Sequence, residues 1–109
     1  MGKIVIKNEA ENKKYELEYN RSAIVRMEKA GFSIEKMQTE PISTITLLLR
    51  GAFYMHNPSL EDGEIDAICD KIEISEGFVK ALTELYTEAL LSLSGQNKDK
   101  TKNFKWEKI

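Results

Sequence analysis

His56 and Cys69 are the one pair of side chains in this sequence that could act as base and nucleophile, since the chain contains a single histidine and a single cysteine. A catalytic dyad needs both groups within hydrogen-bonding reach and a third group that orients the base. Each residue instead continues an apolar helical pattern, and unpaired cysteines commonly pack as small buried hydrophobes. We therefore predict a core thiol and a histidine at a helix end, with no catalytic residue.

A run of acidic residues offers a second candidate chemistry, the binding of a divalent cation. The run comprises Glu61, Asp62, Glu64, Asp66 and Asp70. Aligned on Gly63, the calcium-binding EF-hand template would place Pro58, Leu60 and Cys69 at ligand positions, where it needs oxygen-bearing side chains. Carboxylates are also expected at a helix start, because they meet the free N–H groups there. We predict no metal ligand and no cofactor.

Other catalytic signatures are missing from the sequence. The six glycines form neither of the glycine-rich phosphate loops, and no serine lies in a G-x-S-x-G elbow. A single cysteine can form neither an intramolecular disulfide nor a multi-cysteine metal knuckle. We therefore expect a protein that is not an enzyme.

Charge is distributed unevenly along the 109 residues, although the net charge is only −2. Residues 1–60 contain nine Lys or Arg and seven Asp or Glu, residues 61–94 contain two and nine, and residues 95–109 contain five and two. The near-neutral total conceals an acidic segment followed by a basic tail, which bears on partners more than on fold. The length suits one domain, which we place at residues 1–95, with a tail at residues 96–109.

The N-terminus and the apolar segments predict a cytoplasmic protein without membrane association. The first apolar run meets polar Asn8 too early for a secretory signal. The most apolar stretch, residues 42–55, contains Arg50 and is too short to cross a bilayer core of about 30 Å.

The first twenty residues have the pattern of a β-hairpin. The β-branched run at residues 4–6 is followed, after a polar loop, by Tyr15, Leu17 and Tyr19 alternating with charged residues. This period of two places the three apolar side chains on one face. A lone hairpin is marginal in water, so this face is expected to rest on helices.

A helix is expected over residues 20–32, because its start and its end both carry capping residues. Asparagine is a common N-cap residue, so Asn20 can begin the helix. Gly31 can adopt the positive φ that is typical of the residue following a helix. Phe32 is then placed to contact Met27 in a Schellman arrangement. Ser33 to Met37 is expected to add a short helical turn.

A second helix is expected over residues 41–56, where proline follows Asn57. One face carries Ile42, Ile45, Leu48, Leu49, Ala52 and Phe53. Leu47 and Tyr54 fall on another face, and a helix that is apolar on more than one side is usually central.

Two further helical patterns complete the predicted fold. Residues 62–72 carry Ile65, Ile68, Cys69 and Ile72 at helical spacing. Residues 76–94 carry an inward face of Phe78, Leu82, Leu85, Tyr86, Ala89 and Leu93, and an outward face of Lys80, Glu84 and Glu88. We predict an α+β fold that is predominantly α, with an N-terminal β-hairpin packed on a bundle of about four helices and a flexible C-terminal tail.

The tail combines five lysines with Phe104 and Trp106, and it allows three interpretations. The aromatic rings could fold back onto the core as a terminal strap. They could stack on the bases of a single-stranded nucleic acid, which the acidic charge of the whole chain disfavours. They could also be presented to a protein partner, since a spacing of two suits an extended strand that adds to a sheet edge.

The order of these elements resembles that of small phage tail assembly chaperones from prophages of Gram-positive bacteria. The likeness is carried by Lys-Lys-Tyr-Glu-Leu-Glu-Tyr-Asn-Arg at 13–21, Met-Glu-Lys-Ala-Gly-Phe at 27–32, Leu-Leu-Arg-Gly-Ala-Phe at 48–53 and His-Asn-Pro-Ser-Leu at 56–60. It extends over residues 3–94 and contains no catalytic motif.

The resemblance implies a non-enzymatic protein that binds the tape-measure protein, keeps its apolar helices soluble and helps recruit tail-tube subunits during virion assembly. The side chains expected to contact partners are Phe104, Lys105, Trp106, Ile109, Leu47 and Tyr54. Self-association is left open. The alternative is a small nucleic-acid-binding phage regulatory protein, which would bind DNA in a salt-dependent way.

Overall fold

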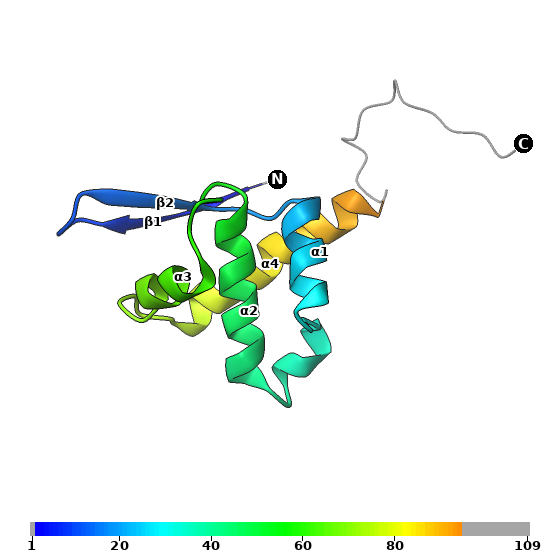
Figure 1. Cartoon of the computed structure of the whole chain (residues 1–109). Helices are drawn as coiled ribbons and strands as arrows, with labels where there is room; N and C mark the ends of the chain where they lie inside the picture. The colour runs from blue at the N-terminus through cyan, green and yellow to red at the C-terminus, as the bar shows by residue number, and fades with distance from the viewer. Residues whose placement is uncertain (1, 95–109) are drawn as a thin grey trace, which may run out of the picture.

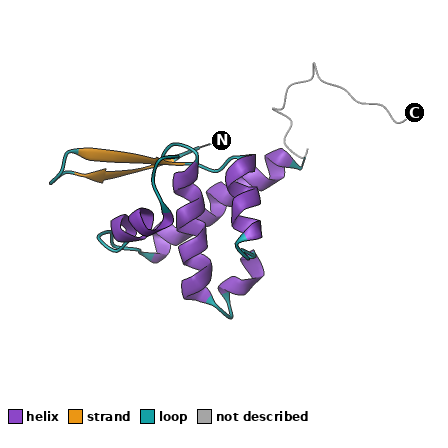
Figure 2. Ribbon diagram, viewed as in Figure 1, coloured by secondary structure: helices purple, strands orange, loops and turns teal. Residues whose placement is uncertain are grey.

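A computed structural model describes residues 2–94, and residues 1 and 95–109 lie outside the described part. Within this range the elements are, in chain order, β1 (Ile4–Asn8), β2 (Lys13–Leu17), α1 (Arg21–Lys29), the 3-10 helix η1 (Ile34–Met37), α2 (Pro41–Tyr54), α3 (Asp62–Cys69) and α4 (Glu76–Leu93). The fold is α+β and predominantly α, as predicted from the sequence (Figure 2).

The N-terminal strands form the predicted antiparallel hairpin. Ile4 pairs with Leu17 and Ile6 pairs with Tyr15, so the alternating apolar side chains share one face. That face rests on α2, where the Tyr15 ring lies 5.8 Å from the ring of Phe53 and Leu17 is fully buried. Figure 1 shows the hairpin lying across one end of α2 and extending over α3.

Helix α1 begins and ends where its capping residues predict. The side chain of Asn20 accepts a hydrogen bond of 2.8 Å from the Ala23 N–H. Gly31 has a φ of +99°, and the N–H of Phe32 donates to the Met27 carbonyl while that of Gly31 donates to the Glu28 carbonyl. These two bonds are the Schellman pair, which confirms the predicted helix end.

Helix α2 is the central element of the described body, with α1, α3, α4 and β2 packed around it (Figure 1). Its residues Leu48, Ala52 and Phe53 are fully buried. Gly51 allows α1 to approach closely, because a Cβ at this position would lie 2.6 Å from Cγ of Met27. The helix ends at Tyr54, two residues before the predicted boundary at His56.

Three aromatic rings connect the hairpin, α1 and α4. The Tyr86 ring on α4 packs edge-on against the rings of Tyr19 and Phe32, at centroid distances of 5.7 and 5.0 Å. The Tyr19 hydroxyl donates a 2.7 Å hydrogen bond to the Leu48 carbonyl. Burial raises the pKa of Tyr19 well above its ordinary value, so this phenol stays a donor across the neutral range.

Helix α3 is shorter than predicted, since it ends at Cys69 and leaves half-buried Ile72 in the connection to α4. Helix α4 agrees with its predicted pattern. Leu82, Leu85, Tyr86 and Ala89 are buried, Phe78 and Leu93 pack at the edge of the core, and Lys80, Glu84 and Glu88 are exposed. None of the described helices has both the length and the apolar character needed to cross a membrane.

Candidate binding groove

The two residues considered for catalysis occupy different environments. Cys69 is buried in the core cluster, whereas His56 follows the end of α2 and is exposed rather than part of the apolar helix face expected from its pattern. The His56 ring lies 2.9 Å from Glu18 and 3.6 Å from Glu16, so it connects the end of α2 to the hairpin. No hydrogen bond joins His56 to Cys69 among the described residues.

The thiol of Cys69 is held in its protonated form. Burial, followed by the nearby carboxylates of Asp66 and Asp70, raises its pKa to about 11. Reactive cysteines instead have lowered pKa values in electropositive surroundings, because the thiolate is the nucleophile. The environment of Cys69 is therefore that of a core thiol.

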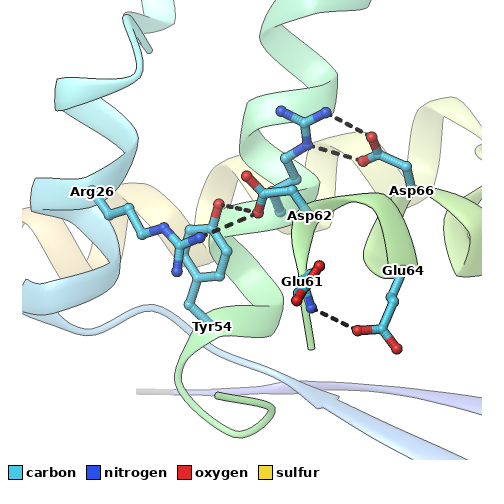
Figure 3. A network of polar contacts seen from close by, with 7 residues as sticks. Arg26, Tyr54, Glu61, Asp62, Glu64 and Asp66 are labelled. Atoms are coloured by element: carbon cyan, nitrogen blue, oxygen red, sulfur yellow. Dashed lines mark hydrogen bonds and ion pairs between the residues drawn. The ribbon is translucent and has the colours of Figure 1, made fainter. Parts of the chain in front are cut away.

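The acidic run is used mainly to hold helices together. Figure 3 shows Asp62 accepting hydrogen bonds from the Tyr54 hydroxyl at 2.8 Å and from Arg26 at 3.4 Å. Asp66 accepts two bonds from Arg50, at 2.9 and 2.6 Å. These contacts attach α3 to α1 and α2. Within residues 2–94, no three His, Cys, Asp or Glu side chains are grouped so as to hold a metal ion.

The first residues of α3 show why some of these acids are there. The Glu64 side chain accepts a 3.0 Å bond from the Glu61 N–H, the reciprocal part of a capping box (Figure 3). Such carboxylates also interact favourably with the positive end of the helix dipole. Helix initiation therefore accounts for the acidic residues at this point of the chain.

An open apolar groove of about 970 Å³ lies beside α2. Its walls are the first half of α2, the end of α3 with the connection that follows, and the start of α4. The lining residues are Met37, Pro41, Ile42, Ile45, Thr46, Leu49, Asp66, Cys69, Asp70, Ile74, Ser75, Glu76, Val79 and Lys80. We call this surface the α2–α4 groove.

Ile42 is the clearest difference from the sequence prediction. It was expected to be buried with the rest of its helix face, but 78% of it is exposed in the α2–α4 groove. Ile74 of the connection after α3 is also exposed. Helical periodicity correctly places Ile42 on the face of Ile45 and Leu49, yet within residues 2–94 no element covers Ile42, although Thr44 in the same helical turn is buried.

The rim of the α2–α4 groove is acidic. Asp66, Asp70 and Glu76 face one basic side chain, Lys80, among its lining residues. Asp66 is already bonded to Arg50. Asp70 and Glu76 have no ion-pair partner within residues 2–94. Among the described residues, then, neither carboxylate is neutralised by a basic side chain.

The remaining predicted contact residues lie partly on α2 and partly outside the described chain. Leu47 and Tyr54 are both half-buried on α2. Tyr54 is engaged within the protein, since its hydroxyl bonds Asp62 and the Arg26 guanidinium lies 3.9 Å from its ring centre. The residues Phe104, Lys105, Trp106 and Ile109 lie outside the described residues.

A smaller hollow of about 550 Å³ lies between the hairpin and α3. Its lining includes Ile6 and Tyr15 from the strands, and Ile68, Lys71 and Ile72 from α3 and the residues after it. Charged and polar residues of the hairpin turn complete its rim, so it offers less continuous apolar surface than the α2–α4 groove.

Fold and groove together define a small α+β domain built around one central helix, with an uncovered apolar surface beside it. The chain belongs to the DUF5055 family, a domain of unknown function, whose match covers residues 1–108. No curated protein and no solved structure gives a significant match to it.

Proposed function

We propose that this protein is a phage tail assembly chaperone without enzymatic activity. In this role it binds the tape-measure protein in the host cytoplasm and helps recruit tail-tube subunits during virion assembly. The supporting observation is the α2–α4 groove of the described residues, in which Ile42, the most exposed of the large apolar side chains at 78%, lies with exposed Ile74. Contiguous exposed apolar surface with a polar rim is typical of protein interaction sites.

The acidic rim of the groove supports binding to protein rather than to nucleic acid. Asp70 and Glu76 would repel the phosphates of a polyanion that approached this surface. The same carboxylates favour solubility of a surface that must expose apolar side chains between binding events. For this reason we rank a DNA-binding regulator below a chaperone.

The basic aromatic tail is proposed to supply a second contact. Phe104 and Trp106 are large rings flanked by lysines, and aromatic anchors often contribute much of an interface energy. In this proposal the groove holds an apolar segment of the tape-measure protein, and the tail engages the same partner or a tail-tube subunit.

Co-expression with the tape-measure protein of the same phage tests the proposal. The wild-type chain should keep that partner in the soluble fraction and should retain it in an affinity pull-down. The variant Ile42→Gln/Ile74→Gln should lose most of both effects. The matched control Val25→Gln/Leu91→Gln also replaces two exposed aliphatic side chains, but these lie outside the groove and should matter little.

Two results would contradict the proposal. The tape-measure protein could remain insoluble and uncaptured by the wild-type chain under conditions where both are well expressed. Alternatively, a gel-shift titration could reveal tight DNA binding that weakens steeply with salt, which would favour the regulatory alternative.

A further inference from the structure

The side of α2 that lines the groove has the spacing of a helix-packing ridge, along which Ile42 is exposed, Ile45 is half-buried and Leu49 is buried. Ile42, Ile45 and Leu49 follow one another at three and four residues, so their side chains align along one side of the helix. Val79 on α4 and Ile74 on the preceding connection line the same groove. Ridges of this kind pack against the side chains of another helix.

The exposure of the lining favours a protein segment over a small molecule. Small-ligand pockets enclose most of the ligand surface. Here Ile42 is 78% exposed, so the groove encloses its contents from one side only. Such a shape suits a partner that brings its own bulk to close the groove.

A helical segment fits the walls better than an extended one. All the lining residues lie on helices or on the connections between them, and neither strand of the hairpin contributes. An extended peptide would find no strand edge to pair with its backbone N–H and C=O groups. A helix satisfies those groups internally and needs only to bury its apolar face.

The charges at the rim specify the flanks of that helix. Asp70 and Glu76 precede and follow Ile74 in the sequence, line the same groove, and have no basic partner within residues 2–94. Lysine or arginine side chains beside the apolar stripe of a bound helix would pair with them. Complementary charges of this kind also favour one partner over others.

We infer that the α2–α4 groove binds a basic amphipathic helix of a protein partner. This inference rests on the protein-binding role proposed above and adds the chemistry of the bound segment. The apolar stripe of the helix lies on Ile42 and Ile45 of α2, above buried Leu49, and its basic flank faces Asp70 and Glu76.

Two synthetic helical peptides test this inference on the full chain. Both carry the same stripe of leucines at helical spacing, and the flanking positions are lysine in one and glutamate in the other. The lysine peptide should bind about tenfold more tightly or better in a calorimetric titration. In the variant Asp70→Asn/Glu76→Gln, the difference between the two peptides should shrink several-fold.

The groove variant locates the binding site. Ile42→Gln/Ile74→Gln should weaken binding of the lysine peptide by roughly tenfold or more, because burial of aliphatic side chains is a large part of such affinities. Val25→Gln/Leu91→Gln should bind within about twofold of the wild type. Circular dichroism melts verify that both variants remain folded.

Three results would overturn the inference. The two peptides could bind equally well. The groove variant Ile42→Gln/Ile74→Gln and its control Val25→Gln/Leu91→Gln could also weaken binding to the same extent. The variant Phe104→Ala/Trp106→Ala could also bind the lysine peptide tenfold more tightly than the wild type, which would identify the tail of the chain as the occupant. The proposed chaperone role fails separately, if the lysine peptide binds in the groove but the tape-measure protein is not retained.

Discussion

The guanidinium of Arg50 binds the carboxylate of Asp66 through two parallel hydrogen bonds, Nε to Oδ1 at 2.9 Å and Nη2 to Oδ2 at 2.6 Å. Arg50 belongs to α2 and Asp66 to α3, so the pair fixes the distance between two walls of the α2–α4 groove. Bidentate pairs of this kind combine binding energy with a defined orientation.

Replacing Arg50 by methionine should lower the free energy of unfolding by about 0.5–1 kcal/mol, because the pair is only partly shielded from solvent. Urea denaturation followed by circular dichroism measures the change. The variant Lys3→Met is a suitable control, since it breaks an ion pair with Glu16 that is more exposed and should change stability little. An equal loss of unfolding free energy in both variants would contradict the larger stabilisation that we assign to the Arg50–Asp66 pair.

The contribution of this pair should depend on pH in a defined direction. The hydrogen bond from Arg50 lowers the pKa of Asp66 below its ordinary value of 3.8. Such a group stabilises the fold above its unfolded pKa, and the stabilisation is lost as the pH falls through the lower folded pKa. Denaturation curves of wild type and Arg50→Met should therefore differ at about pH 6 and converge toward about pH 2. A constant difference across that range would contradict this assignment.

Gly51→Ala should destabilise the protein by about 1–3 kcal/mol, because the new methyl group would overlap buried Met27 in a closely packed core. Gly63→Ala is the matched control, since a Cβ there meets nothing within 4 Å and α3 should gain from the helix propensity of alanine. In thermal melts, the melting temperature of Gly51→Ala should fall, whereas that of Gly63→Ala should rise or stay unchanged. A similar loss in both would mean that α1 and α2 do not approach as closely as described.

Cys69 should react slowly with thiol reagents at neutral pH, because its pKa of about 11 leaves little thiolate. The rate of iodoacetamide labelling should rise as the pH approaches that value, and urea-unfolded protein should label faster at every pH tested. A thiol pKa raised on folding stabilises the protein below the unfolded value near 9, and this stabilisation is lost as the pH rises toward 11. Rapid labelling of folded protein at pH 7 would contradict the buried, protonated thiol.

Local chemistry made several parts of the fold predictable. Asn20 and Gly31 define the ends of α1 because their side chain and backbone preferences act within a few residues of chain. The alternation of Tyr15 and Leu17 similarly predicts the strand face that rests on α2. In both cases the decisive interactions are close in sequence, so a pattern of a few residues is enough to identify them.

The groove could not be predicted in the same way, because it depends on what a helix face meets after folding. Periodicity groups Ile42 with Leu49, but it does not tell which of the two will be covered by another element. The walls come from three helices, and their separation depends on pairs such as Arg50 with Asp66, whose spacing of sixteen residues gives no local signal. The sequence therefore indicates an apolar face without showing where it stays open.

The groove walls have a consequence for the order of folding. Every lining residue lies between Met37 and Lys80, in one uninterrupted stretch joined by short connections. Contacts between residues close in sequence form quickly, since closing short loops costs little chain entropy. The strands of the hairpin are also close in sequence, but a lone hairpin is marginal in water and its apolar face rests on α2. Hydrogen-exchange pulse labelling during refolding should therefore find α2 and α3 protected before β1. A nascent chain would in that case acquire its groove before its sheet.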